Sequence, residues 1–520
     1  MQLDYLKFEK GFIKKRWQDR LSIALVFPNS YQVGMANLGF LSIYQRLNAF
    51  EEIVCERVFL PEKPSLPVSI ESKRPLKEFD IIIFSISFEV DYLNVVTLLK
   101  WSQIPLLPEE RRELVLAGGV ATWLNPLPIL KFFDGILLGE WEAMEEVLIS
   151  EFLKFSEKKN LLKELKEQPF FLCSEKRNTS VKVLKQKELK TPAFSRVISE
   201  KSSFVNTYLI EVSRGCGRGC RFCAAGFVYR PPRSYSYEAL KQCIEQIPPF
   251  AKLGVIGLEF MEKETILNLG KELLKKKVTL TFSSLRLDAL SREFLELFKT
   301  TRSIAIAPET GSLKLKKVIN KCLTEEMIME ALKLFEEEGI KKVKLYFMLG
   351  LPFEEKEDIE ETARFIQKLQ NLKLKLKLVC SVSFFSPKPH TPFQWMPLYG
   401  LKELKKRGQF LKKLLKNPPW IKMDSPREAY LQALLARSTE NAADVLASYT
   451  SDKMSLTNLL KDLEKTSILN PEEKEDFIFP WDFIKTGVKK TYLFEEWEKA
   501  KSGQLTPFCI PGKCKRCGAC

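Results

Sequence analysis

The chain has 520 residues, 45% hydrophobic and 11% aromatic, which excludes a disordered protein and predicts two or three globular domains. Lys and Arg outnumber Asp and Glu by 82 to 66, and the net charge of +16 suits either an RNA partner or a lysine-rich solvated surface. No uncharged apolar run could cross a bilayer, and Asp4 and Glu9 interrupt any signal peptide, so we expect a cytoplasmic protein with no membrane partner.

A charged arm, residues 1–20, precedes a first predicted domain over residues 21–158. Buried parallel strands alternate there with amphipathic helices, which is typical of a doubly wound, Rossmann-like sheet with its ligand site at the carboxyl ends of the strands. The predicted strands are Leu21–Phe27, Phe79–Ser87, Glu113–Gly119 and Phe133–Gly139, and the predicted helices are Asn37–Phe50, Asp91–Ile104 and Trp141–Lys158. Loops at two strand ends, residues 28–34 and Gly118-Gly119, favour either a bound ligand or simple turns.

A lysine-rich connector, residues 159–205, leads to a second alternation over residues 206–395. Six β/α repeats predict a partial (β/α)6 barrel, whose catalytic groups lie at the carboxyl ends of its strands. The predicted strands are Thr207–Ser213, Val255–Phe260, Val278–Leu285, Ser303–Pro308, Val343–Gly350 and Leu376–Phe385, separated by helices over 237–247, 262–276, 288–299, 324–338 and 355–371.

Residues 396–500 form a basic, helical region, and a Cys-rich tail follows over residues 501–520. The lysines between 402 and 416 would either contact RNA phosphates or form the solvated face of a helix that packs through Leu404 and Leu411. The leucine stripe favours packing.

Three closely spaced cysteines carry the strongest chemical signal. Cys216, Cys220 and Cys223 directly follow the first predicted barrel strand, and glycines at 215, 217 and 219 let the loop wrap a bound group. Three thiolates hold three irons of a [4Fe–4S] cluster and leave one iron open for S-adenosylmethionine (SAM). Cleavage of SAM would then give a 5′-deoxyadenosyl radical. Zinc or structural cysteines are the alternatives, and Phe222 is a candidate for packing on the SAM adenine.

Four more cysteines lie in the last twelve residues of the chain, at Cys509, Cys514, Cys517 and Cys520. Four thiolates suffice for a closed site, which an auxiliary [4Fe–4S] cluster or a structural zinc ion would occupy. Free thiols at the end of the chain are the third reading.

The loop Glu211–Gly226 contains the CxxxCxxC signature and resembles the radical SAM superfamily, in particular an uncharacterised branch with an N-terminal cobalamin-binding-like domain. Further matches are Ser283–Arg286, Ala307–Gly311, Lys344–Pro352 and Pro387–Trp395. The resemblance covers most of residues 20–400.

The resemblance implies that polar groups at the strand ends bind SAM. Its candidates are Ser283, Arg286 and Glu309 for the carboxylate, amino and ribose groups. Gly257 and Glu259 stand at the second strand end, although the superfamily's Gly-rich motif is not matched there. A low-potential electron donor is also implied.

The chain contains a single histidine, His390, in a Pro-rich loop after the sixth predicted strand. This scarcity excludes His-rich zinc sites. The position predicts a barrel-mouth residue that serves as a proton donor, substrate anchor or cluster neighbour, whereas a lone histidine is more often a hydrogen-bonded structural residue.

The first domain departs from the cobalamin-binding pattern Asp-x-His-x-x-Gly that the resemblance implies. The aligned stretch begins at Asn29 and places Tyr31 where the cobalt-binding histidine would stand. Phenol is a poor cobalt ligand at neutral pH, so any cobalamin would be held by the sheet loops, including Gly118 and Gly119. A scaffold or docking domain is the alternative.

Three functions are consistent with these features. The first is a radical SAM enzyme that transfers a methyl or sulfur-type group to RNA or a ribosomal macromolecule. The second is a cobalamin-dependent methyltransferase of a small metabolite. The third is a non-enzymatic iron–sulfur protein that binds nucleic acid. The sequence does not determine the substrate or the oligomeric state.

Overall fold

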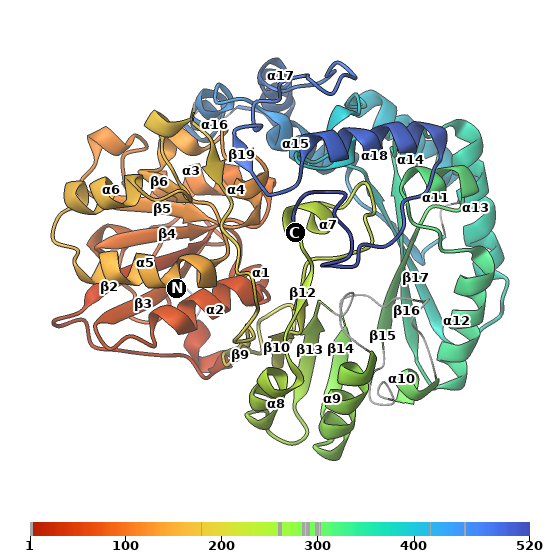
Figure 1. The fold of residues 1–520 in the computed structure, drawn as a ribbon, viewed down its shortest axis with the longest axis horizontal. Coiled ribbons are helices and arrows are strands. Elements are labelled where there is room, and N and C mark those ends of the chain that lie inside the picture. Colours follow the sequence, from red (N-terminus) through yellow and green to blue (C-terminus); the bar gives the residue numbers. More distant parts are fainter. Residues whose placement is uncertain are drawn as a thin grey trace.

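The computed structural model describes residues 4–177, 179–257, 263–282, 287, 292–296, 301, 303–416, 418–451 and 454–520. Two α/β units face each other, with the C-terminal segments between and above them (Figure 1). The doubly wound domain and the partial barrel predicted from the sequence are both present. None of the described helices is long and apolar enough to cross a bilayer.

The N-terminal domain is a six-stranded sheet in the order β3-β2-β4-β5-β6-β7, parallel except at the antiparallel edge strand β7. Its central strands are buried along nearly their whole length, as their unbroken apolar sequences require. The strands are β2 (Leu21–Phe27), β3 (Ile53–Phe59), β4 (Ile81–Ser85), β5 (Leu114–Gly118), β6 (Gly135–Leu137) and β7 (Phe171–Leu172). The helices are α1 (Tyr31–Gly34), α2 (Leu38–Leu47), α3 (Tyr92–Trp101), α4 (Val120–Leu124), α5 (Trp141–Leu153) and α6 (Lys158–Lys166).

Strand β3 was not predicted, because Glu56 and Arg57 interrupt its apolar pattern. The Arg57 side chain is fully buried and lies 2.7 Å from both Glu9 and Glu71. Two carboxylates therefore compensate the buried guanidinium. Because Glu9 belongs to residues 1–20, the predicted arm is part of the domain, and β1 (Glu9–Lys10) pairs with β9 (Ile198–Ser199).

The barrel consists of two parallel sheets, β10-β13-β14 and β15-β16-β17-β18. Its strands are β10 (Thr207–Glu211), β13 (Lys252–Ile256), β14 (Thr279–Phe282), β15 (Ser303–Glu309), β16 (Lys342–Leu349), β17 (Lys377–Phe384) and β18 (Ile421–Met423). The helices are α7 (Ala225–Val228), α8 (Tyr237–Glu245), α9 (Lys263–Lys275), α10 (Arg292–Glu296), α11 (Leu313–Val318), α12 (Glu325–Glu337) and α13 (Lys356–Gln370). Strand β18 extends the predicted set of six and lies in the segment expected to be helical.

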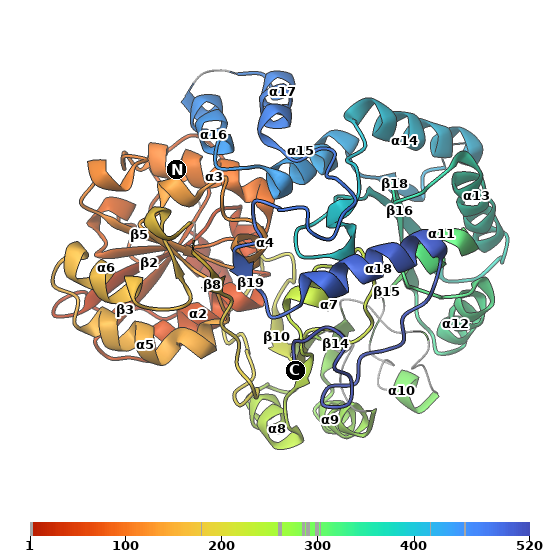
Figure 2. The same ribbon diagram turned by 45° about the horizontal axis from the view of Figure 1, so that its top comes forward.

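The C-terminal segment joins the two units. Asn125, which follows α4, donates to the carbonyls of Ala436 and Ser438 at 3.1 and 2.7 Å. From the barrel loop after β17, Lys388 also reaches the N-terminal domain and lies 2.7 Å from Glu89. Helix α16 packs on α3 of the N-terminal domain, whereas α15 contacts β17 of the barrel (Figure 2). The segment comprises α14 (Leu401–Leu415), α15 (Pro426–Arg437), α16 (Ala442–Ser451), α17 (Leu456–Thr466) and α18 (Lys490–Ser502), and β19 (Ile484–Lys485) pairs with β8 (Val181–Lys182).

Candidate active site

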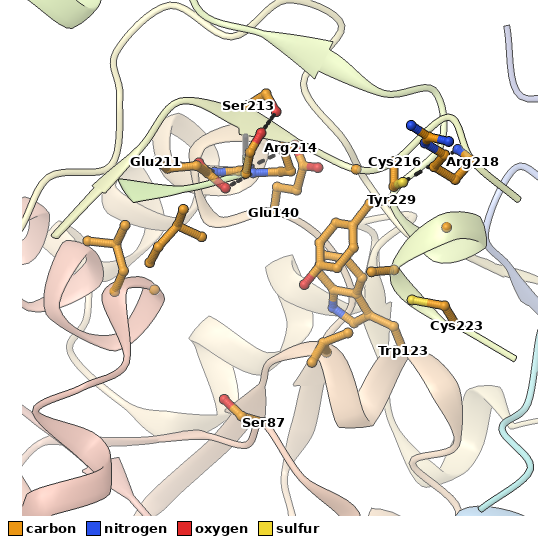
Figure 3. Close-up of a pocket in the computed structure, with 18 of the residues that line it drawn as sticks. Ser87, Trp123, Glu140, Glu211, Ser213, Arg214, Cys216, Arg218, Cys223 and Tyr229 are labelled. Atoms are coloured by element: carbon orange, nitrogen blue, oxygen red, sulfur yellow. Dashed lines mark hydrogen bonds and ion pairs between the residues drawn. The ribbon is translucent and has the colours of Figure 1, made fainter. Parts of the chain in front are cut away.

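A cavity of about 1260 Å³ lies between the carboxyl ends of the N-terminal strands and the mouth of the barrel. The N-terminal domain contributes Ser87 and Trp123, and the barrel contributes Ser213, Cys216 and Cys223 (Figure 3). Residues 505–508 of the tail also line the cavity. In a doubly wound sheet and in a β/α barrel, ligands bind at the carboxyl ends of the strands. The two domains therefore join their expected ligand-binding edges in one cavity.

Cys216, Cys220 and Cys223 all line this cavity and are each half-buried. Their loop follows β10 and the short strand β11 (Ser213–Arg214), which pairs with β12 (Arg233–Ser234). One backbone amide points at a sulfur, because Arg218 N–H donates to Cys216 Sγ at 3.4 Å, and the Gly226 N–H donates to the Cys223 carbonyl oxygen at 3.1 Å. An amide donor to sulfur stabilises thiolates and cluster-bound sulfur.

The donor set suits a cluster better than a single ion. Among the described residues, no three Cys, His, Asp or Glu side chains converge as the ligands of one metal ion. Zinc needs all of its sulfurs about 2.3 Å from one point, whereas a [4Fe–4S] cube spreads them over separate corners. Burial raises the pKa of Cys220 to about 12, so metal binding at this loop must displace protons.

An ion pair between a half-buried lysine and a buried glutamate lies beside the cysteine loop. Lys321 Nζ lies 2.6 Å from Glu309 Oε1 at the end of β15 and 5.9 Å from the ring of Phe222. Burial raises the pKa of Glu309 against the attraction of Lys321. Burial opposes the charged form of Lys321, but attraction by its neighbours, Glu309 first, leaves the pKa of Lys321 raised. Sequence reasoning found Glu309 but not Lys321, because no local pattern marks a lysine that reaches a residue twelve positions earlier.

An ion-pair network connects the cysteine loop to the N-terminal domain. Arg214, two residues before Cys216, lies 3.2 Å from Glu140, 3.1 Å from Glu142 and 2.6 Å from Glu211 (Figure 3). Arg233 lies 2.6 Å from the same buried Glu140. The network fixes the loop relative to both domains, and no sequence motif indicated it.

The predicted SAM residues divide into two groups. Phe222, Gly257 and Glu309 line the cavity, whereas Glu259, Ser283 and Arg286 lie outside the described residues. Gly257 has φ +91°, and a Cβ atom there would lie 2.0 Å from the carbonyl oxygen of Ser213. The glycine thus permits β13 to approach the start of the cysteine loop.

Only some of the residues that were candidates for cobalamin binding line the cavity. Gly118 and Gly119 line the cavity, but Asn29 and Tyr31 do not. Asn29 donates to Asp91 Oδ1 at 2.7 Å, and Tyr31 is buried with its hydroxyl 2.6 Å from Glu9 and 2.8 Å from Ser199. Burial, reinforced by Glu9, raises the pKa of Tyr31, so its phenol stays protonated. Both side chains therefore make hydrogen bonds to other protein groups away from the cavity lining.

His390 does not line the cavity, contrary to its expected place at the barrel mouth. It is buried, its backbone N–H donates to Gln394 Oε1 at 3.1 Å, and its Nε2 has no hydrogen-bond partner in the described part of the chain. Burial lowers the pKa of His390 to about 3. The histidine is therefore a neutral core residue.

Family models match two separate parts of the chain. A model described as "Radical SAM proteins, N-terminal" matches residues 39–172, and the model of the radical SAM superfamily matches residues 210–366, which include the three cysteines. The protein is a radical SAM enzyme. Enzymes of this superfamily use a [4Fe–4S] cluster and SAM, so the non-enzymatic alternative is wrong.

This radical SAM enzyme is similar in sequence to two relatives and in fold to one solved structure. "Uncharacterized protein MJ0966" of Methanocaldococcus jannaschii is 28% identical over 86% of this chain and 95% of its own. Threonylcarbamoyladenosine tRNA methylthiotransferase MtaB of Aquifex aeolicus is 21% identical over 58% of this chain and 73% of its own. The radical SAM methyltransferase TsrM of Kitasatospora setae, solved with cobalamin and a [4Fe–4S] cluster, has a TM-score of 0.51 at 12% identity, over 74% of this chain and 75% of its own. The last likeness concerns the fold alone.

Proposed function

We propose that Cys216, Cys220 and Cys223 hold the [4Fe–4S] cluster of this enzyme and that SAM binds beside it in the cavity. The amide donor aimed at the Cys216 sulfur and the place of all three cysteines in one cavity support this assignment. When bound, the cluster supplies the electron that cleaves SAM to methionine and a 5′-deoxyadenosyl radical.

The chain itself orients SAM and excludes water from it. Phe222 offers a ring for the adenine, and the Glu309 carboxylate suits the hydroxyl groups of the ribose. The Lys321 ammonium, already beside the thiols, balances negative charge on the loop or on the SAM carboxylate. Residues 505–508 cover one side of the cavity.

We propose further that the substrate is an RNA, which enters along the inner face of the barrel. Val343, Leu345 and Phe347 of β16 are buried, and Phe347 packs on Phe365 of the outer helix α13. The alternate residues Lys344 and Tyr346 are exposed and must face the barrel interior.

The same inner face continues across the neighbouring strands. Tyr346 pairs with Ser381 of β17, which in turn pairs with Lys422 of β18, so an aromatic ring, a hydroxyl and an ammonium group form one row. Lys422 is exposed, and Tyr346 is 39% exposed. A lysine beside an open aromatic ring suits the phosphate and the base of a single-stranded nucleotide. This row is the observation that carries the RNA proposal.

The proposed reaction is transfer of a methyl or sulfur-type group, with electrons from a low-potential donor. The relative MtaB is a tRNA methylthiotransferase by name, which supports an RNA substrate and a sulfur-type reaction. The charge of +16 adds the general affinity for phosphate.

The test uses the anaerobically reconstituted full chain with dithionite, SAM and total tRNA and rRNA. RNA should stimulate formation of 5′-deoxyadenosine. The double variant Lys344→Gln/Lys422→Gln should lose most of this stimulation and reduce the salt dependence of RNA binding by about two units of slope. A matched control, Lys405→Gln/Lys406→Gln on the outer helix α14, should retain the stimulation. Stimulation by ribosomal protein alone, or equal behaviour of the two double variants, overturns the RNA assignment.

Cobalamin-dependent methylation of a small metabolite is the second candidate. The cavity is large, Gly118 and Gly119 line it, and the fold resembles that of a cobalamin-bound methyltransferase. Because Tyr31 is turned into the domain, cobalamin would bind here without a side-chain ligand from that position. A stoichiometric corrin spectrum after reconstitution with hydroxocobalamin supports this candidate, and its absence removes it.

A further inference from the structure

The Cys-rich tail folds back onto the cysteine loop of the active site. Cys509 N–H donates to the carbonyl oxygen of Gly217 at 2.8 Å, so the two cysteine groups touch through their backbones. A Cβ atom at Gly217 would lie 2.7 Å from the ring of Phe508. Both views show the C-terminus beside α7, which follows Cys223 (Figures 1 and 2).

Buried hydrogen bonds hold the tail in this place. The guanidinium of Arg221, which lies between Cys220 and Cys223, is fully buried and donates to the carbonyl oxygen of Gln504 at 2.6 Å. Asn320 donates to the carbonyl oxygen of Thr506 at 3.2 Å and accepts from the Thr506 N–H at 3.0 Å. The tail is thus a fixed part of the site.

The tail brings several thiols together. Cys509 and Cys517 are 2% and 1% exposed, Cys514 is half-buried and Cys520 is exposed. The Cys514 N–H donates to the Ile510 carbonyl oxygen at 2.9 Å, so a tight turn brings Cys514 back toward Cys509. Positive φ angles at Gly512 and Gly518 turn the chain around this group.

Two arginines lie near these sulfurs. Arg230 is 3% exposed and donates to the Tyr492 hydroxyl at 3.2 Å. Arg516 Nε donates to Cys514 Sγ at 3.2 Å. A guanidinium buried against a neutral thiol gains little, whereas beside a thiolate it compensates charge and makes a charge-assisted hydrogen bond. The surroundings therefore suit deprotonated, metal-bound sulfur.

We propose that Cys509, Cys514, Cys517 and Cys520 hold a second [4Fe–4S] cluster directly beside the first. Four thiolates close the site, so this cluster has no corner for SAM and acts as a one-electron carrier. It takes one electron from a low-potential one-electron donor, passing from the 2+ to the 1+ state, and returns to 2+ on delivering it to the cluster at Cys216–Cys223. No bond forms or breaks in this step. The carrier role, unlike the site itself, rests on the proposed function.

The test is the iron and sulfide content of the anaerobically reconstituted full chain, with EPR before and after addition of SAM. Wild type should hold about eight irons, and Cys514→Ser/Cys517→Ser about four while keeping a SAM-induced change of its signal. Cys216→Ala/Cys220→Ala should also hold about four irons, and its EPR signal should not change when SAM is added. Cys322→Ser, at an exposed thiol outside both groups, should retain eight.

Because Cys517 is buried, Cys520→Ser provides a variant at the exposed last residue that leaves the core intact. It should lose or alter the SAM-insensitive signal. Three results would overturn the second cluster. They are about four irons in wild type, an iron count that is unchanged in both tail variants, and a stoichiometric zinc ion that is lost in those variants. Loss of the SAM response from wild type, with the tail signal intact, would instead overturn the proposed function.

Discussion

Replacing Gly257 by alanine should push the second barrel strand away from the start of the cysteine loop. The new Cβ atom would lie 2.0 Å from the Ser213 carbonyl oxygen, and since side-chain carbons rarely approach within 3.0 Å, the backbone must move by about 1 Å. A left-handed conformation costs a non-glycine residue roughly 1–2 kcal/mol, and overpacking costs roughly 1–3 kcal/mol. We expect a loss of about 2–5 kcal/mol of unfolding free energy.

The assay is urea unfolding followed by circular dichroism, together with SAM binding to the reconstituted protein. Gly339→Ala is the matched control, because Gly339 has φ +80° but its Cβ would meet nothing within 4 Å. The control should lose only the roughly 1–2 kcal/mol of the left-handed backbone and bind SAM normally. Equal losses in the two variants would refute the argument that close approach to Ser213 explains this glycine.

Three further predictions concern buried charge. Glu140→Ala leaves Arg214 and Arg233 without their shared carboxylate and should lower the free energy of unfolding by about 3–5 kcal/mol. The control Glu151→Ala removes a surface ion pair with Lys154 and should lower it by at most about 0.5 kcal/mol. Comparable urea midpoints for the two variants would contradict this prediction. His390 stays neutral in the folded chain, with a pKa of about 3, so wild type should lose about 1.4 kcal/mol of stability per pH unit as pH falls below 6.5, relative to His390→Asn. Parallel stability curves for these two proteins would show that the histidine titrates freely. Burial raises the pKa of Asp91 to about 7, so wild type should lose stability as pH rises from about 4 to 7. The variant Asp91→Asn should be more stable than wild type by up to about 4 kcal/mol at pH 8 and equally stable at pH 4. A variant less stable than wild type at pH 8 would contradict this prediction.

The sequence alone determined the features that depend on local pattern. Unbroken apolar strands such as Ile81–Ser85 predicted a sheet buried on both faces, and their alternation with helices predicted both α/β units. The spacing of Cys216, Cys220 and Cys223 after a strand predicted the radical SAM class. These properties are fixed by residues a few positions apart, so a single sequence is enough to find them.

Only the tertiary structure decided which distant groups meet. Lys321 reaches Glu309, and Arg214 reaches Glu140 of the other domain, although neither pair has a sequence signature. Burial also gave Tyr31 and His390 internal roles, because a side chain's orientation depends on elements packed from elsewhere in the chain. The return of Cys509 to Gly217 is of the same kind: long-range packing brought the tail to the active site, where the sequence had shown only its cysteines.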